Sequence, residues 1–149
     1  MLAVTAGMAC RRMTPGDLAA LSDSVAQAEL VPARPYWDRR AAAHAEVIGM
    51  LGAVAADPVL GRLASLAAGW AYDLAIAAGP GADGIILGSR RRLLRHLRAG
   101  DAEAAGREME AHLRVLRFMG RLSRGGRGGL GGTGKAGPGR QPRAPRSAA

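Results

Sequence analysis

Two histidines and one arginine occupy apolar positions of this sequence and have the chemistry to bind a ligand. His112 recurs at helical spacing with four apolar residues, Ala105, Met109, Leu116 and Met119. His44 and Arg90 fall on, or at the edge of, similar apolar faces in two other segments. A guanidinium matches a carboxylate and an imidazole can ligate a metal ion, so these residue types indicate a binding site. A lone histidine on such a face is more often a core residue hydrogen-bonded to a neighbour.

The three side chains are candidates for one shared polar pocket. Ligand sites in helical bundles are built from inward side chains on facing helices. Periodicity does not show that they meet, so separate structural or surface roles remain the alternative. Three acids are candidates to accompany them: Glu108, which lies four residues before His112 and could pair with it, Glu46 and Asp73. No Ser-His-Asp or Cys-His arrangement and no phosphate-binding loop is present, so we do not expect an enzyme.

Helical periodicity predicts the elements that carry these residues. Six helices and no strand are expected, at about residues 2–12, 15–31, 36–56, 58–78, 85–98 and 102–123. Thr14, Asp57 and Asp101 are suitable N-caps, and GPGADG at 79–84 predicts a turn. Because the connections are short, neighbouring helices should be antiparallel. The predicted fold is an all-α antiparallel helical bundle in which many Ala and Gly residues permit close helix contacts.

The charge is concentrated at one end of the chain. Residues 124–149 contain six Arg or Lys and no acid, which is +6 of the formal charge of +9. Residues 1–123, the expected folded domain, are therefore only weakly basic, and aromatic residues are 3% of the chain, so a nucleic-acid-binding face is not indicated. The Gly-, Arg- and Pro-rich segment 124–149 is predicted to be a disordered tail.

Cysteine usage and hydropathy point to the cytoplasm. The single cysteine, Cys10, excludes an intrachain disulfide and fits a reducing compartment. The first ten residues lack the basic region of a signal peptide. The most apolar stretch, 60–78, is interrupted by Arg62 and Asp73, so no membrane span is expected.

The order of elements and three stretches resemble the FCD domain, the all-helical C-terminal ligand-binding and dimerisation domain of FadR-type GntR-family transcription regulators. The stretches are ACRRMTPGDLAAL from Ala9, EVIGMLGAVAADPVLGRL from Glu46 and RRRLLRHLRAGDAEAAGREMEAHL from Arg90. The resemblance covers about residues 8–122. The step Gly100-Asp101, with His112-Leu113 eleven residues after Asp101, is its most specific part.

The resemblance also implies a metal position. Many members of that family hold a divalent metal with an Asp, a His four residues later and one His on each of the last two helices. These positions fall at His44, Ile48, Arg90 and His112, so only the last keeps its type. Isoleucine cannot ligate and arginine is a permanent cation. Two remaining ligands are too few for a tight site. We therefore expect no metal cofactor, although His44 and His112 are weak candidates for a degraded zinc site.

Two functions follow from the resemblance. The first is an effector-binding and dimerisation domain of a GntR/FadR-family transcription regulator, in which His44, Arg90 and His112 bind a small carboxylate metabolite. Such regulators read DNA with a winged helix-turn-helix domain, for which these 149 residues leave no room. The alternative is a standalone helical interaction module. It would pair with related regulators or contact nucleic acid non-specifically through its basic tail.

Overall fold

The computed structural model describes residues 1–127, with side chains described up to Leu122. Within this range the chain forms six α-helices and no strand, as the sequence predicts. Their bounds are α1 Leu2–Arg12, α2 Pro15–Leu30, α3 Trp37–Val54, α4 Pro58–Ala78, α5 Asp83–Arg98 and α6 Ala102–Arg127. A short 3₁₀ turn, η1, at Pro80–Ala82 precedes α5. None of the described helices is long and apolar enough to cross a membrane.

Side-chain caps fix three of the helix starts at the predicted residues. The Thr14 hydroxyl accepts from the Asp17 backbone N–H, and the Asp17 carboxylate accepts from the Thr14 N–H, which is a complete capping box before α2. Asp57 accepts two backbone N–H bonds at the start of α4. Asp101 accepts the N–H of Ala104 at the start of α6. Because capping residues have characteristic types and positions, the starts of these three helices could be predicted from the sequence.

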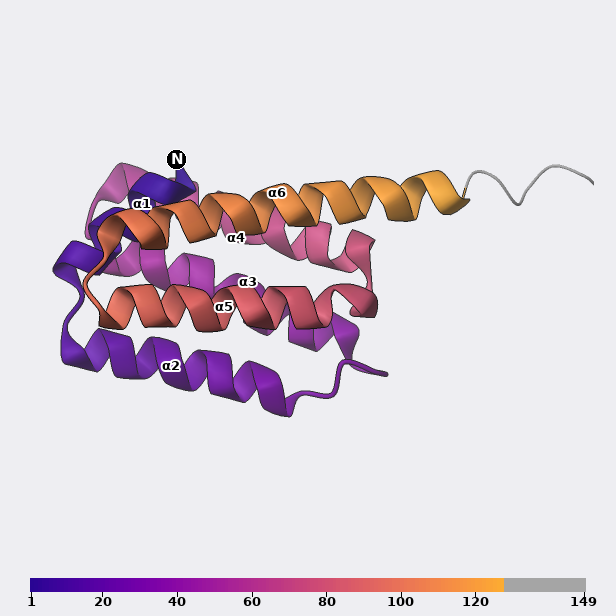
Figure 1. The fold of residues 1–149 in the computed structure, drawn as a ribbon, viewed down its shortest axis with the longest axis horizontal. Helices are drawn as coiled ribbons and strands as arrows, with labels where there is room; N and C mark the ends of the chain where they lie inside the picture. Colours follow the sequence, from indigo (N-terminus) through magenta and orange to yellow (C-terminus); the bar gives the residue numbers. More distant parts are fainter. Residues whose placement is uncertain (128–149) are drawn as a thin grey trace, which may run out of the picture.

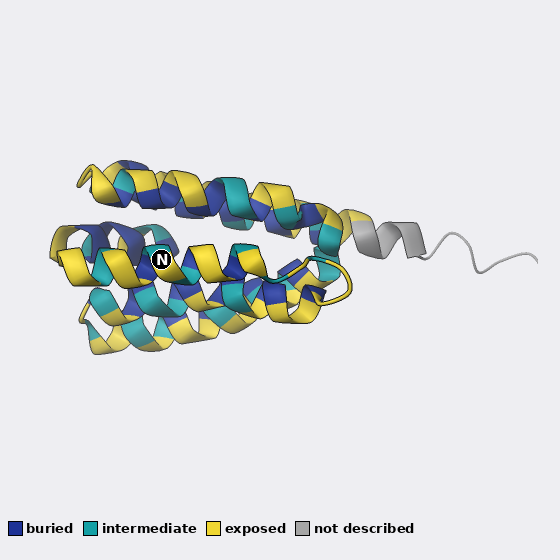
Figure 2. Ribbon diagram, turned by 90° about the horizontal axis from the view of Figure 1, so that it is seen from below, coloured by how far each residue is buried: buried dark blue, intermediate teal, exposed yellow. Residues whose placement is uncertain are grey.

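The helices form an antiparallel bundle (Figure 1). In that view α2, α5 and α6 lie side by side, with α3 and α4 behind them, and contacts join α2 to α5, α5 to α6 and α3 to α4. The short α1 packs on the first half of α6. Buried residues line the inward faces of the helices (Figure 2). This core contains Leu21, Ile48, Leu51, Leu93 and Met109.

Small residues allow α3 and α4 to approach closely. A Cβ atom added at Gly52 of α3 would stand 2.3 Å from the Cβ of Ala64 of α4. No side chain at position 52 fits in that space, so the Gly52 backbone packs directly against Ala64 and Gly61 of α4. The close contact depends on glycine at this position.

Two boundaries differ from the sequence-based prediction. The expected turn at residues 79–84 is shorter, because Asp83 and Gly84 belong to α5. α6 continues through residues 124–127, which we had assigned to the tail. The rest of the predicted tail, residues 128–149, lies outside the described residues, and its disorder stays a prediction.

Candidate functional site

Arg90 and His112 meet in the centre of the bundle. They project from the antiparallel helices α5 and α6, which the turn at Gly100 joins. Gly100 has a φ of 68°, a left-handed conformation that glycine adopts without strain. The Arg90 Nη2 atom lies 3.3 Å from His112 Nε2. The residues are only 1% and 3% exposed, so this contact is inside the core.

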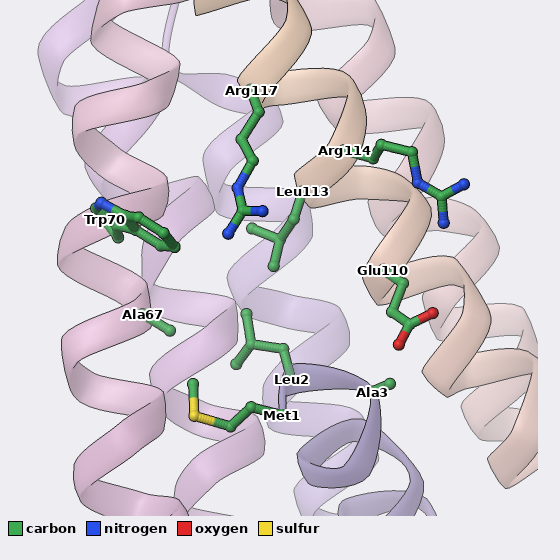
Figure 3. Close-up of a pocket in the computed structure, with 9 residues that line it drawn as sticks. All are labelled: Met1, Leu2, Ala3, Ala67, Trp70, Glu110, Leu113, Arg114 and Arg117. Atoms are coloured by element: carbon green, nitrogen blue, oxygen red, sulfur yellow. The ribbon is translucent and has the colours of Figure 1, made fainter.

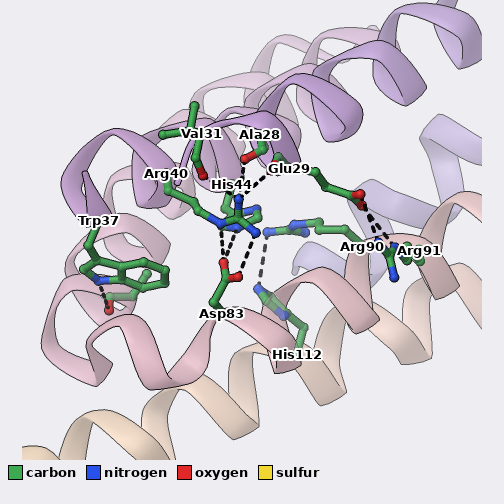
Figure 4. A network of polar contacts seen from close by, with 11 residues as sticks. Ala28, Glu29, Val31, Trp37, Arg40, His44, Asp83, Arg90, Arg91 and His112 are labelled. Carbon is green, nitrogen blue, oxygen red and sulfur yellow. Dashed lines mark hydrogen bonds and ion pairs between the residues drawn. The ribbon is translucent and has the colours of Figure 1, made fainter. Parts of the chain in front are cut away.

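His44 lies close enough to this pair to feel the charge of Arg90, and it contacts Asp83 (Figure 4). His44 lies on α3, is 2% exposed, and places its Nε2 atom 3.4 Å from Asp83 Oδ1. Asp83, in the first turn of α5, also forms an ion pair with Arg40 of α3, with 2.7 Å between Arg40 Nη2 and Asp83 Oδ2. Arg40 Nη1 in turn donates to three carbonyl oxygens at the end of α2, those of Ala28, Glu29 and Val31. The cluster therefore ties α2, α3, α5 and α6 together.

The hydrogen bonds define which ring nitrogens carry protons. A guanidinium only donates, so His112 Nε2 accepts from Arg90 and the ring's proton is on Nδ1. A carboxylate only accepts, so His44 donates from Nε2 and its Nδ1 has a free lone pair. Among the described residues, four buried nitrogens of the cluster have no hydrogen-bond partner: His44 Nδ1, His112 Nδ1, Arg90 Nε and Arg90 Nη1. Three are donors and one is an acceptor.

Burial leaves the cluster with an excess positive charge. It lowers the pKa of His44 to about 4, against a smaller opposing effect of Asp83, and it lowers the pKa of His112 well below the usual value. Both imidazoles are thus neutral at pH 7. Burial also lowers the pKa of Arg90 to about 10, which still leaves it charged. The cluster therefore contains two guanidiniums, those of Arg40 and Arg90, and one carboxylate, that of Asp83, which is paired with Arg40. Burial by itself would raise the pKa of that carboxyl group, but hydrogen bonds from Arg40 and His44 lower it.

The acids that we predicted to accompany the pocket lie elsewhere. Glu108 pairs with Arg92 and accepts from the Ser89 hydroxyl, and no bond to His112 is formed. Glu46 and Asp73 are exposed. The acid of the cluster is Asp83, which we had placed in a turn. Two signals pointed to the missed residues: Arg40 is one helical turn before His44, and Asp83 is two turns before Arg90.

The donor set does not fit a divalent metal. Arg90 donates to the Nε2 atom that His112 would offer as a ligand, and Ile48 is fully buried in the apolar core. A dication here would be repelled by the guanidinium of Arg90, which is buried and lies 3.3 Å from His112 Nε2. No three His, Cys, Asp or Glu side chains within the described part of the chain are grouped to hold a metal ion. The residues instead favour an anion.

Comparison with known proteins gives one match. The sequence model of the FCD domain matches residues 3–115 of this chain. No curated protein and no solved structure matches the sequence. The matched range includes α1 from residue 3 onward, α2 to α5, the first half of α6 and every residue of the central cluster.

Proposed function

Because the chain belongs to the FCD family, the effector-binding domains of GntR-family transcription regulators, we propose that its central cluster binds a small organic acid as effector. Arg90, His44 and His112 are the binding residues. The domain acts as a homodimer in the cytoplasm, and a winged-helix domain outside these 149 residues makes the DNA contacts.

The observation that carries this proposal is the guanidinium of Arg90. It is 1% exposed, and its Nε and Nη1 atoms have no hydrogen-bond partner in the described structure. A buried charge without hydrogen bonds is costly, and such groups occur more often at functional sites than in plain cores. A carboxylate accepting from Arg90 would satisfy the free donors and balance the excess positive charge.

The imidazoles give the site its selectivity. His112 Nδ1–H would donate to the acid, while the lone pair of His44 Nδ1 would accept from a hydroxyl or amide group of the ligand. The cluster is enclosed, so the helices around it must separate to admit a ligand. Asp83, whose side chain is 18% exposed against 3% for His44, marks the accessible edge of the cluster. We therefore assign the entry route to the end of the bundle where α5 begins.

A thermal-shift experiment tests the proposal. The melting temperature is measured with acetate, lactate, succinate and benzoate, each paired with its neutral amide, in buffer containing EDTA. A ligand that binds only the folded state raises the melting temperature. We expect at least one acid, and not its amide, to do so. Arg90→Met should lose this response, whereas Arg91→Met, which changes a neighbouring arginine paired with Glu29 on the surface, should keep it.

Two outcomes would count against this assignment. An acid that stabilises Arg90→Met as well as the unmodified protein binds somewhere other than the cluster. A protein that responds to no acid favours the alternative function, a standalone interaction module. That alternative predicts that the protein associates with itself or is retained by related regulators in a pull-down with those proteins.

A further inference from the structure

The ion pair of Arg40 and Asp83 has the geometry of a carboxylate-binding site. The Nε atom of Arg40 donates to one carboxylate oxygen of Asp83, and Nη2 donates to the other across 2.7 Å. Two parallel bonds of this kind are the bidentate arrangement in which a guanidinium recognises a carboxylate. His44 Nε2 lies 3.4 Å from Oδ1 of the same carboxylate. The group that occupies this site is therefore a carboxylate of the protein itself.

The cationic side of this site is held in place without Asp83. Arg40 is 5% exposed, and its Nη1 atom donates to three carbonyl oxygens at the end of α2, across 2.6 to 2.9 Å. These bonds fix the guanidinium and leave its Nε and Nη2 atoms for a carboxylate. His44 is also buried and lies one turn later on the same helix. Because an uncompensated buried charge is strongly destabilising, Arg40 requires an anion at this position.

Asp83, by contrast, lies at the edge of the cluster in a segment rich in glycine. Its side chain is 18% exposed, and the sequence GPGADG places three glycines around it, Gly79, Gly81 and Gly84. A Cβ atom added at any of these glycines would meet no atom within 4 Å outside the local chain, so other residues do not enclose the segment at these positions. The Asp83 carboxylate can therefore turn outward into water, whereas Arg40 cannot follow it.

Arg90 provides a second anchor for an acid beside this site. The charges of Arg40 and Arg90 both lower the pKa of His44, so both guanidiniums lie near this imidazole. The Nε and Nη1 atoms of Arg90 have no hydrogen-bond partner in the described structure. A monoacid that enters past an outward-turned Asp83 and binds Arg90 leaves Arg40 without a counter-ion. An acid with two carboxylates covers both guanidiniums.

We propose that Arg40 and His44 form a carboxylate-binding site that Asp83 fills in the free protein, and that the second carboxylate of a dicarboxylate effector displaces Asp83 from it. This inference rests on the proposed function and narrows the effector from an organic acid to a small dicarboxylate. Attachment to the chain gives the Asp83 carboxylate a high effective concentration at Arg40, so a carboxylate free in solution does not displace it. A diacid that Arg90 already holds has the same advantage of attachment.

Chemical rescue with formate tests the carboxylate site separately from the effector. Asp83→Ala removes the internal carboxylate, and formate is small enough to take its place. Both proteins compared carry Arg90→Met, so that the effector site cannot contribute. We expect formate, and neither formamide nor chloride at the same ionic strength, to raise the melting temperature of Arg90→Met/Asp83→Ala by several degrees and to leave that of Arg90→Met unchanged. If the double variant is unfolded without formate, recovery of its helical circular dichroism on adding formate is the same result.

Arg117 is the control for formate bound elsewhere on the protein. It lines a surface cavity between α1, α4 and α6, and its guanidinium lies 4.7 Å from the centre of the Trp70 ring (Figure 3). Arg117→Met, added to the double variant, should keep the formate response. Arg40→Met, added in the same way, should abolish it.

The displacement of Asp83 is tested by calorimetric titration of the unmodified protein. Malonate, succinate and glutarate are each compared with their monoamide, which has the same chain and one charge. We expect at least one diacid to bind about tenfold more tightly than its monoamide, the gain expected for a hydrogen bond between charged groups. Arg40→Met/Asp83→Ala, which lacks both the site and its internal occupant, should bind the two forms equally. Arg39→Met, which changes an exposed arginine beside the Tyr36 ring, is the control and should keep the preference.

Three results would overturn the proposal. A lack of rescue by formate, or rescue that persists in Arg40→Met, would mean that Arg40 and His44 do not form a carboxylate site. A preference for the diacid that survives in Arg40→Met/Asp83→Ala would place its second carboxylate elsewhere. Equal binding of diacid and monoamide to the unmodified protein would show that Asp83 is not displaced, while the proposed function would stand. Failure of the proposed function itself is distinct, since the unmodified protein would then bind no acid at all.

Discussion

The guanidinium of Arg90 donates to the imidazole of His112 across 3.3 Å inside the bundle, and neither side chain hydrogen-bonds an acid among the described residues. The carboxylate of Glu108 raises the pKa of Arg90 through its charge alone, without a hydrogen bond, because it pairs with Arg92. The centre of this bundle therefore contains a cation where a helical bundle ordinarily places apolar side chains. That arrangement has measurable consequences for stability and for ligand binding.

The first prediction concerns the energetic cost of Arg90. Arg90→Met keeps most of the side-chain volume and removes a buried charge whose desolvation is poorly compensated. We expect the free energy of unfolding in urea to rise by about 1–2 kcal/mol, as for other buried charges replaced by apolar residues. Arg91→Met, on the surface, should change it by less than about 1 kcal/mol. A large loss of stability in Arg90→Met would show that the arginine is structural rather than held in place for a ligand.

The second prediction concerns the counter-ion. Asp83→Asn leaves the buried guanidinium of Arg40 without its ion-pair partner. Breaking a buried ion pair by neutralising one partner is strongly destabilising, so we expect a loss of about 3 kcal/mol in the same measurement. Asp73→Asn, an exposed acid on α4, is the control and should change stability by less than about 0.5 kcal/mol. Equal effects of the two substitutions would contradict the role assigned to Asp83.

The contrast between Asp83 and His112 shows how far the sequence could predict this site. Helix starts at Thr14, Asp57 and Asp101 were predictable because capping is a local interaction. The inward position of Arg90 and His112 was predictable because the periodicity of α5 and α6 fixes their faces. Asp83 was missed because its helix begins two residues before the apolar pattern does. Its partnership with Arg40 depends on how α3 packs against α2 and α5, a long-range contact that no local pattern encodes.

The third prediction concerns pH. The pKa of His44 is about 4 in the folded protein, below its ordinary value of 6.5. Between these values the unfolded chain binds more protons than the folded one, so stability falls as pH falls from 6.5 toward 4. His44 alone should account for a loss of about 3 kcal/mol at pH 4. His112, whose pKa is lowered in the same direction, adds to it.

Two variants isolate the contribution of His44 to this pH dependence. His44→Gln retains a donor for Asp83 and does not titrate, so the slope of unfolding free energy against pH should decrease by up to about one proton between pH 4 and 6.5. His96→Gln, which changes an imidazole outside the cluster, is the control. An unchanged slope in His44→Gln would show that this imidazole is not held neutral in the folded state.

The fourth prediction uses two glycines of α3. Gly52→Ala places a Cβ 2.3 Å from that of Ala64, so α3 and α4 must separate. We expect a loss of about 1–3 kcal/mol in unfolding free energy. Gly49→Ala, three residues earlier in the same helix, meets no atom within 4 Å and should gain about 0.5–1 kcal/mol from helix propensity. Effects of the same sign at both positions would contradict the close contact between these helices.

The last prediction concerns the choice between an anion and a metal at the cluster. Arg90 occupies one of the positions that the family resemblance assigns to a metal ligand, and its charge opposes a dication there. The melting temperature of the unmodified protein should therefore not change when Zn²⁺ is added or when EDTA removes it. Arg90→His removes the cation and places a third imidazole on α5, facing the core into which His44 of α3 and His112 of α6 project. Three histidines are a sufficient protein ligand set for zinc, so Zn²⁺ should raise the melting temperature of this variant. Arg90→Met, which loses the charge without gaining a ligand, is the control and should not respond.

A zinc-dependent rise in the melting temperature of the unmodified protein would instead mean that His44 and His112 hold a metal despite Arg90. The anion site proposed at this cluster would then be wrong.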